Sequence, residues 1–155
     1  MDEGFRRASV IVIDDDEGIR TSLANILSSR GYVVDTAQDG REALMKYKEH
    51  DYDLALIDII LPGIKGTKLL KETPKGSPDM LKVIVTGFPD LWNAIDSVNE
   101  GADAYVTKPF EVSVLIDTIR RLLERQAADR KYNVEKVKGF IEGRTKELVD
   151  AKGAI

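Results

Sequence analysis

The 155-residue sequence contains no cysteine and only one histidine, His50. Without cysteine the chain cannot form a disulfide scaffold, a thiolate zinc site or a cysteine nucleophile. A single histidine excludes multi-histidine metal sites and argues against a Ser-His-Asp triad. His50 lies in a charged stretch, where we expect a surface histidine rather than a phosphorylated one. These absences exclude several large classes of enzyme and metal site.

Long apolar runs and a strong charge imbalance are also missing. No stretch approaches the roughly 18 apolar residues of a membrane span, and Met1 to Arg7 lacks the apolar core of a signal peptide. The formal net charge of −4 gives no general attraction to nucleic acid or anionic lipid. Hydrophobic residues make up 43% and charged residues 32%, which is typical of globular proteins. We therefore expect a soluble cytoplasmic protein without a membrane or nucleic-acid partner.

What the sequence does contain is a regular alternation of apolar runs and helical patterns. Apolar runs predict strands at Val10–Ile13, Tyr32–Thr36, Leu54–Ile57, Val83–Val85 and Ala104–Val106. Helical patterns follow at Glu17–Ser29, Gly40–Lys48, Thr67–Glu72 and Leu91–Asn99, and a long one begins at Glu111. Strands that helices cover on both faces are continuously apolar, and right-handed crossovers place helices on both faces. Five repeats therefore predict an α/β fold with a doubly wound parallel sheet.

Polar side chains follow four of the predicted strands, at the point where each strand ends. In chain order they are Asp14, Asp15 and Asp16; Asp58; Thr86 and Gly87; and Thr107, Lys108 and Pro109. Ligands of an open parallel sheet bind beyond the carboxyl ends of its strands. We therefore expect acids, a hydroxyl and a cation to meet at one edge of the sheet.

The chemistry of this edge follows from the residue types. Carboxylates in one small pocket repel one another unless a cation compensates. Lys108 supplies one positive charge, and Mg²⁺ matches ligands that are all oxygen. A central carboxylate can attack a phosphoryl group and give an aspartyl phosphate, while Lys108, the metal and the Thr86 hydroxyl stabilise its oxygens. The pattern predicts phosphoryl acceptance on an aspartate.

Taken singly, each of these residues has a more ordinary explanation. An Asp after a strand is more often a helix N-cap or a turn residue than a ligand, and we expect Asp16 to cap the first helix. A Thr that closes a strand is usually a turn residue, and a lone Lys is usually solvated. The prediction depends on their joint placement at four strand ends.

Four segments resemble the receiver domain of two-component response regulators. They are Val10–Asp16, Asp58–Gly66, Val85–Gly87 and Lys108–Phe110. The resemblance covers about Ala8 to Leu123, so we expect a receiver domain over residues 1–123 and a helical extension or coiled-coil linker over 124–155. It implies a flavodoxin-like (βα)5 fold with strand order 2-1-3-4-5. The sequence thus resembles a phosphorylatable receiver of a two-component phosphorelay.

The resemblance also implies the residues that hold the metal and the phosphoryl group. Asp58 would accept the phosphoryl group, Asp15 would bind Mg²⁺ directly, and Asp14 would support it, partly through water. The backbone carbonyl of Ile60 would be the remaining protein ligand. Ile60 is apolar where some relatives carry a polar group that can orient water, so we expect a long-lived phosphoryl group. Leu61 replaces the common methionine of the family, a change that conserves volume.

A second implied set of residues forms the switch. Thr86 and Lys108 would bind the phosphoryl group, and the rotamer of Tyr105 would follow Thr86. The bond before Pro109 would be cis. The face made by the fourth helix, fifth strand and fifth helix would then change its affinity for an output protein; Trp92 either packs the fourth helix or belongs to this face. A histidine kinase or phosphotransfer protein would supply the phosphoryl group.

The residues after Leu123 continue the helical pattern. Apolar or small residues fall at Leu123, Ala127, Val134, Val137, Ile141 and Leu148, and Arg130 and Arg144 complete a heptad-like seam. The seam predicts a homodimer through the fifth helix and this extension, or a connecting helix; the alternative is a frayed tail, since Gly139 and Gly143 each cost about 1 kcal/mol. The segment Arg144–Leu148 resembles linkers to sensor or kinase domains, which suggests the N-terminal piece of a longer protein. No DNA-binding module follows in this chain.

Two other functions stay open. A phosphatase of the haloacid-dehalogenase type would use Asp14 and Asp16 as nucleophile and acid, but it needs a further acidic strand end after Lys108 and leaves Asp58 without a role. A pseudo-receiver would keep the fold and bind partners without phosphorylation. The intact set of Asp58, Asp15, Thr86 and Lys108 argues against it. We therefore expect self-catalysed phosphoryl transfer and slow autodephosphorylation rather than a turnover enzyme.

Overall fold

A computed structural model describes residues 6–59, 61, 66–87, 99 and 101–153 of the chain. The chain divides into two compact units, Met1–Leu123 and Glu124–Ile155. The first unit holds the sheet and the helices packed on it, and the second is helical. Within the described residues, no helix is both long enough and apolar enough to span a membrane.

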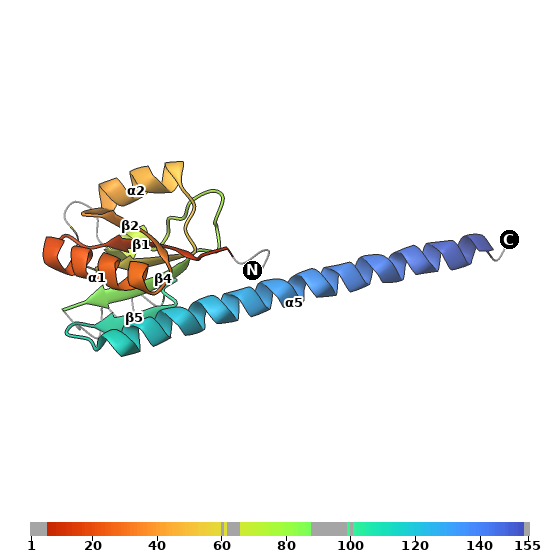
Figure 1. The fold of residues 1–155 in the computed structure, drawn as a ribbon. Helices are drawn as coiled ribbons and strands as arrows, with labels where there is room; N and C mark the ends of the chain where they lie inside the picture. The colour runs from red at the N-terminus through yellow and green to blue at the C-terminus, as the bar shows by residue number, and fades with distance from the viewer. Residues whose placement is uncertain (1–5, 60, 62–65, 88–98, 100, 154–155) are drawn as a thin grey trace. The chain divides into compact units, whose positions relative to one another are not determined.

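Five strands among the described residues form one parallel sheet (Figure 1). They are β1 (Ser9–Ile13), β2 (Val33–Ala37), β3 (Leu54–Ile57), β4 (Leu81–Thr86) and β5 (Ala104–Thr107). Their order is β2-β1-β3-β4-β5, and every neighbouring pair is parallel. The predicted α/β fold, doubly wound sheet and strand order are confirmed. The third strand matches its predicted bounds, and the others differ from theirs by one or two residues at one or both ends.

Each of the first two helices begins directly after a capping aspartate. In α1 (Glu17–Ser29), the Asp16 side chain accepts a hydrogen bond of 3.0 Å from the Ile19 amide. In α2 (Gly40–Glu49), Asp39 accepts one of 2.8 Å from the Glu42 amide. Each cap satisfies an amide that has no partner inside its helix. The predicted capping role of Asp16 is confirmed.

The third helix is shorter than the sequence pattern predicts. The pattern extends to Glu72, but α3 (Gly66–Leu69) ends three residues earlier. The amides of Lys71 and Glu72 donate to carbonyls three residues back, at Lys68 and Leu69, so the chain tightens into turns instead of continuing the helix. The predicted fourth helix, Leu91–Asn99, lies outside the described residues except for Asn99.

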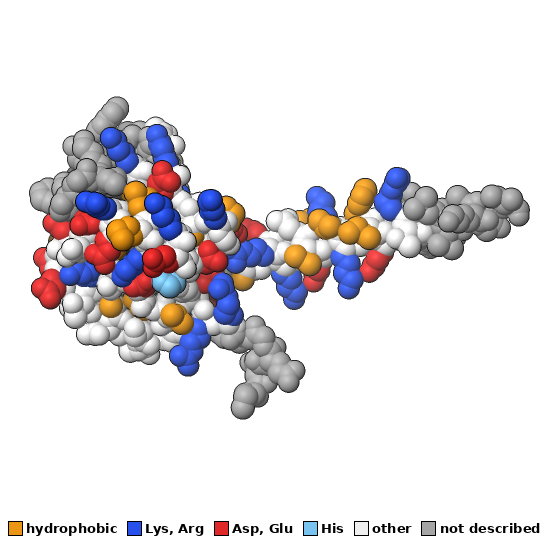
Figure 2. All heavy atoms as spheres, turned by 90° about the horizontal axis from the view of Figure 1, so that it is seen from above, with side chains coloured by type: hydrophobic (Ala, Val, Ile, Leu, Met, Phe, Trp, Pro, Cys, Tyr) orange, Lys and Arg blue, Asp and Glu red, His pale blue; other side chains and the backbone are white. Residues whose placement is uncertain are grey.

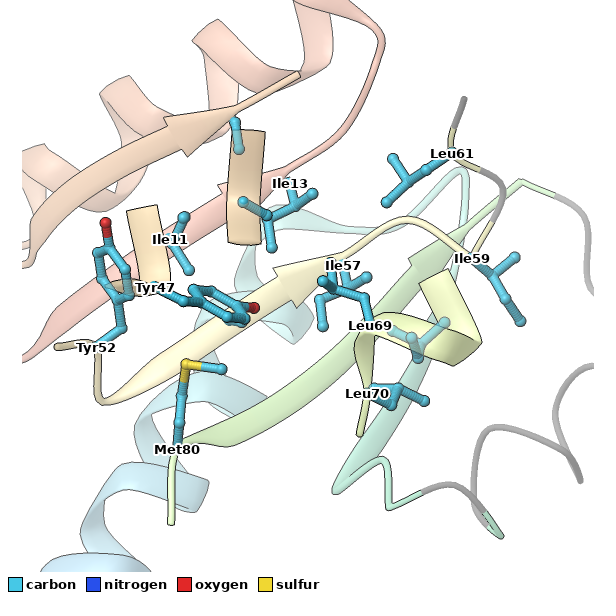
Figure 3. Packing of buried hydrophobic residues seen from close by; sticks show 14 residues of the cluster. Ile11, Ile13, Tyr47, Tyr52, Ile57, Ile59, Leu61, Leu69, Leu70 and Met80 are labelled. Atoms are coloured by element: carbon cyan, nitrogen blue, oxygen red, sulfur yellow. The ribbon is translucent and has the colours of Figure 1, made fainter. Parts of the chain in front are cut away.

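Side chains of the strands alternate between two buried clusters, one on each face of the sheet. The first joins strand residues to α2 and α3 (Figure 3): Ile11, Ile13, Ala55, Ile57 and Ile84 pack with Tyr47, Leu69 and Met80. The second joins them to α1 and to the start of α5 (Val112–Gly153): Val10, Val12, Leu54, Leu56, Val83 and Val85 pack with Leu23, Leu27, Leu115, Ile116 and Ile119. Both faces are covered, which explains why Val10–Ile13 of β1 and the whole of β3 are continuously apolar.

The second unit consists of the later turns of α5. Its apolar side chains are exposed, and Figure 2 shows them on the surface of the extension. They include Tyr132, Val134, Val137, Phe140 and Ile141. A Cβ added at Gly139 or Gly143 would meet nothing within 4 Å. Because α5 continues to Gly153, the predicted C-terminal helical extension is present.

Candidate functional site

Four of the predicted site residues lie at the carboxyl edge of the sheet. Asp14 directly follows β1, Asp58 follows β3, Thr86 closes β4 and Lys108 follows β5. The register holds these strand ends level, because Ile13 pairs with Ile57, Ile57 with Ile84, and Thr86 with Thr107. Asp58 takes a central place because β3 is the middle strand. Its amide donates a 2.9 Å hydrogen bond to the carbonyl of Ile13.

Lys108 bridges two of the carboxylates. Its Nζ donates to Asp14 Oδ2 at 2.6 Å and to Asp58 Oδ2 at 3.1 Å. The side chains are 14%, 5% and 11% exposed for Lys108, Asp14 and Asp58, so the ion pairs are shielded from water. Burial alone would lower the pKa of the Lys108 ammonium, but its hydrogen bonds to both carboxylates and their charges raise that pKa above the usual lysine range. The site therefore holds a fixed positive charge beside Asp58.

Three carboxylates meet at this edge. Asp14, Asp15 and Asp58 each offer an oxygen, and these oxygens lie within 4.8 Å of one another. Asp14 and Asp58 are buried, whereas Asp15 is exposed. A compact set of carboxylate oxygens, open to solvent on one side, suits a hard cation that retains waters, such as Mg²⁺. Ile60, whose carbonyl was predicted as a further ligand, lies outside the described residues.

The backbone around Asp14 is held at several points. Its amide donates to the carbonyl of Ala37 at 3.1 Å, and its Oδ1 accepts from the Asp16 amide at 2.9 Å. Its carbonyl accepts a 2.8 Å hydrogen bond from Nη1 of Arg20, in α1. Sequence reasoning missed Arg20. The available signal was its place one turn after the cap, because helical side chains point back toward the N-terminus and so reach the preceding loop.

The predicted switch residues lie on neighbouring strands. Thr86 is fully buried, and its carbonyl accepts a 2.6 Å hydrogen bond from the Lys108 amide. Tyr105 is half-buried and pairs with Ile84, two residues before Thr86. Side chains two residues apart share a face, so Tyr105 and Thr86 lie on the same face of the sheet. The peptide bond between Lys108 and Pro109 is cis, as the resemblance implies.

Other predicted positions lie away from these contacts. Leu61 is buried in the first cluster, and Thr107 is exposed. His50 is exposed at the end of α2, as expected of a surface histidine. Trp92 lies outside the described residues, as does nearly all of the predicted fourth helix.

Comparison with known proteins identifies the class to which this fold and site belong. Residues 10–138 match the response regulator receiver domain family. The chain therefore belongs to that family, and the resemblance seen in its motifs is confirmed.

Individual relatives agree with this assignment. Regulatory protein VanRB of Enterococcus faecalis is 35% identical over 119 residues, which are 77% of this chain and 54% of that protein. Response regulator MprA of Mycolicibacterium vanbaalenii is 32% identical over 120 residues, 77% of this chain and 52% of the relative. The chain thus spans about half the length of these curated relatives.

Solved structures share the fold. A CheY-like receiver domain protein from Methanospirillum hungatei has a TM-score of 0.76 and 38% identity, covering 80% of this chain and 99% of its own. NtrX from Brucella abortus has a TM-score of 0.75 and 32% identity over 83% of this chain and 30% of its own. A Burkholderia pseudomallei response regulator was solved with a phosphorylated aspartic acid; it has a TM-score of 0.68 and 28% identity over 79% of this chain and 72% of its own.

Proposed function

We propose that this chain is a phosphorylatable receiver of a two-component phosphorelay, in which Asp58 accepts a phosphoryl group in a Mg²⁺-dependent reaction. The observation that carries the proposal is the contact of Lys108 Nζ with both Asp14 and Asp58, beside a third carboxylate. A histidine kinase or phosphotransfer protein would supply the phosphoryl group. The protein would act in the cytoplasm.

Asp58 is the proposed nucleophile because it is central and lies beside a fixed cation. One of its carboxylate oxygens forms the new bond to phosphorus while the P–N bond of the donor phosphohistidine breaks. The electron pair of that bond stays on the imidazole nitrogen, which then takes up a proton. Lys108, paired with Asp58 at 3.1 Å, would offset charge on the transferred oxygens. The product is an aspartyl phosphate.

Asp14, Asp15 and Asp58 would hold Mg²⁺, with the carbonyl of Ile60 as the further ligand that the family resemblance implies. When bound, the ion supplies positive charge that offsets both the mutual repulsion of the carboxylates and the charge of the phosphoryl group. Asp15 is the exposed member of this set, so it would face the water that such an ion retains.

The proposed switch starts from the added charge. A phosphoryl group brings about two negative charges to Asp58. Thr86 and Lys108 would bind its oxygens better in one backbone arrangement than in the other, which shifts the population toward that arrangement. Tyr105 would follow inward, because it lies on the same face as Thr86 on the next strand. The face formed by the fourth helix, β5 and α5 would then bind an output protein differently.

The extension is proposed to bind a second copy of the chain. Val134, Val137 and Ile141 are 67%, 57% and 57% exposed, and their spacing of three and four residues places them on one side of α5. Two such seams would cover each other in a coiled coil and remove these side chains from water. Arg130 and Arg144 interrupt the seam, so the pairing would be weaker than that of an all-apolar seam.

Intact mass tests the proposal. The wild-type chain and Asp58→Asn are incubated with acetyl phosphate, with and without Mg²⁺. We expect a gain of one phosphoryl group in the wild type that needs Mg²⁺ and is absent in the variant. A phosphoryl adduct in Asp58→Asn would refute the assignment. No adduct on a folded wild-type chain would instead support a pseudo-receiver, and turnover of a phosphomonoester would support the phosphatase.

The lifetime of the phosphoryl group depends in this proposal on Ile60. An apolar side chain there cannot orient a water molecule toward the phosphorus. We expect Ile60→Asn to accelerate autodephosphorylation, followed as decay of the phosphorylated mass. Little acceleration would contradict the role given to Ile60, while leaving Asp58 as the acceptor.

A further inference from the structure

The carboxylates of the acidic cluster differ in how they are held. Asp14 and Asp58 both contact Lys108, and Asp14 also accepts from the Asp16 amide. Among the described residues, the carboxylate of Asp15 has no hydrogen bond or ion pair. It is also the exposed member of the cluster. Within the described part of the chain, the backbone is therefore what orients the Asp15 side chain.

The backbone at Asp15 is in turn fixed by a contact from α1. The carbonyl of Asp14 and the amide of Asp15 form one planar peptide group, so the direction of the carbonyl sets the direction in which Asp15 leaves it. That carbonyl accepts the 2.8 Å hydrogen bond from Arg20 Nη1. The backbone of Arg20 is held at the start of α1, because its amide donates to the carbonyl of the N-cap residue Asp16 at 2.9 Å.

We propose that Arg20 is a positioning residue that aims Asp15 at the point shared with Asp14 and Asp58, and thereby sets the affinity of the site for Mg²⁺. This inference rests on the proposed function and deepens it. The Arg20 guanidinium donates to the Asp14 carbonyl and not to a carboxylate oxygen of the cluster. It acts through the Asp14–Asp15 peptide, as residues outside the metal ligands orient the ligands in other metal sites.

The direction in which Mg²⁺ affinity changes when Arg20 is removed distinguishes a positioning role from a purely electrostatic one. Arg20 is a cation close to three carboxylates, and removing a positive charge strengthens the attraction of such a cluster for a divalent cation. If Arg20 acted only through its charge, its loss would tighten Mg²⁺ binding. If it acts by positioning Asp15, its loss weakens Mg²⁺ binding in spite of the charge effect.

The test uses Arg20→Met in the full chain. Methionine keeps an unbranched stem and a good helix propensity, and Arg20 is partly exposed, so we expect α1 to be retained, as checked by circular dichroism. Magnesium chloride is titrated while amide NMR signals are followed. We expect the dissociation constant to rise about tenfold. The matched control is Arg30→Met, which removes one exposed arginine at the other end of the same helix and should leave Mg²⁺ affinity unchanged.

Hydrogen exchange gives a second readout that does not involve the metal. Without Mg²⁺, the Asp16 amide, which donates to Asp14 Oδ1, should exchange faster in Arg20→Met than in the wild type. Equal or tighter Mg²⁺ binding in Arg20→Met would overturn the proposal. A wild-type chain that bound no Mg²⁺ would refute the proposed function first, whereas wild-type binding with unchanged Arg20→Met affinity would refute the role of Arg20 alone.

Discussion

Lys108 Nζ lies 2.6 Å from Asp14 Oδ2, although 94 residues separate the two in the sequence. The contact joins the loop after the first strand to the loop after the last one, and the same ammonium reaches Asp58 at 3.1 Å. In this state Lys108 is shared between the two carboxylates. In the proposed function, a phosphoryl group on Asp58 would add negative charge on one side of Lys108 and would change how its ammonium is shared between Asp14 and Asp58.

Replacing this ammonium should slow phosphorylation. Lys108→Met removes the ammonium that pairs with Asp14 and Asp58. We expect the rate of phosphorylation by acetyl phosphate to fall on the order of 100-fold, the usual cost of losing one group that stabilises developing charge. The rate is measured by intact mass over time.

A lysine away from the site serves as the control. Lys48→Met removes an exposed lysine from α2 and should leave the rate unchanged. Mg²⁺ should also raise the melting temperature of Lys108→Met more than that of the wild type, because the ion replaces the missing charge. A fall in rate of less than about threefold would mean that Lys108 does not stabilise the transferred group.

Stability should depend on the cluster beneath α1 and α5. Leu27 is fully buried between α1 and the sheet. Leu27→Ala should lower the free energy of unfolding by about 2–5 kcal/mol through lost burial and the cavity left behind. Urea unfolding measures this, with Met45→Ala as the control, since Met45 is 59% exposed. A cost near zero for Leu27→Ala would contradict the packing described for this cluster.

The sheet and much of the site could be predicted because they depend on patterns along the chain. The run Val10–Ile13 alternates between the two buried clusters, which is what a strand covered on both faces requires. Asp14, Asp58 and Lys108 follow from their place at strand ends in a parallel sheet. None of these predictions requires knowledge of a side-chain rotamer.

Other features could not be predicted, because they depend on loop geometry and rotamers. The hydrogen bond of Arg20 goes to a backbone carbonyl, and an arginine on a half-exposed helix face looks the same in sequence whether or not it makes one. The end of α3 at Leu69 is set by turns that form three-residue hydrogen bonds, although the composition continues to favour helix as far as Glu72. Periodicity does not distinguish these alternatives.

Acid should weaken a polar cluster on β2. Asp35 accepts hydrogen bonds from the Tyr52 hydroxyl at 2.6 Å and from Lys46 Nζ at 2.9 Å. Burial raises the pKa of Asp35, but these hydrogen bonds outweigh it and hold the pKa below its usual value of 3.8. Because the folded-state pKa is lowered, the carboxylate stabilises the fold above its unfolded-state pKa, and this contribution is lost as the pH falls through the lowered value.

Asp35→Asn should reveal this dependence. We expect the variant to be less stable than the wild type at neutral pH, by a modest amount because the Asp35 side chain is 34% exposed. The difference in unfolding free energy should shrink as the pH falls below about 4. Urea unfolding over a pH series measures it, with Asp129→Asn in the exposed extension as a control. A difference that stays constant down to the lowest pH would contradict the lowered pKa of Asp35.

The oligomeric state should depend on the seam of the extension. Val137 lies on the seam and Tyr132 lies off it, although they are 57% and 63% exposed, so the two positions form a matched pair. If a second copy covers the seam, Val137→Asp places a charge in the interface and converts the dimer to a monomer, whereas Tyr132→Asp leaves the dimer intact. Analytical ultracentrifugation over a range of concentrations distinguishes the two. A wild-type chain that is monomeric at every concentration, or an equal effect of both substitutions, would contradict pairing through this seam and leave the extension as a connecting helix.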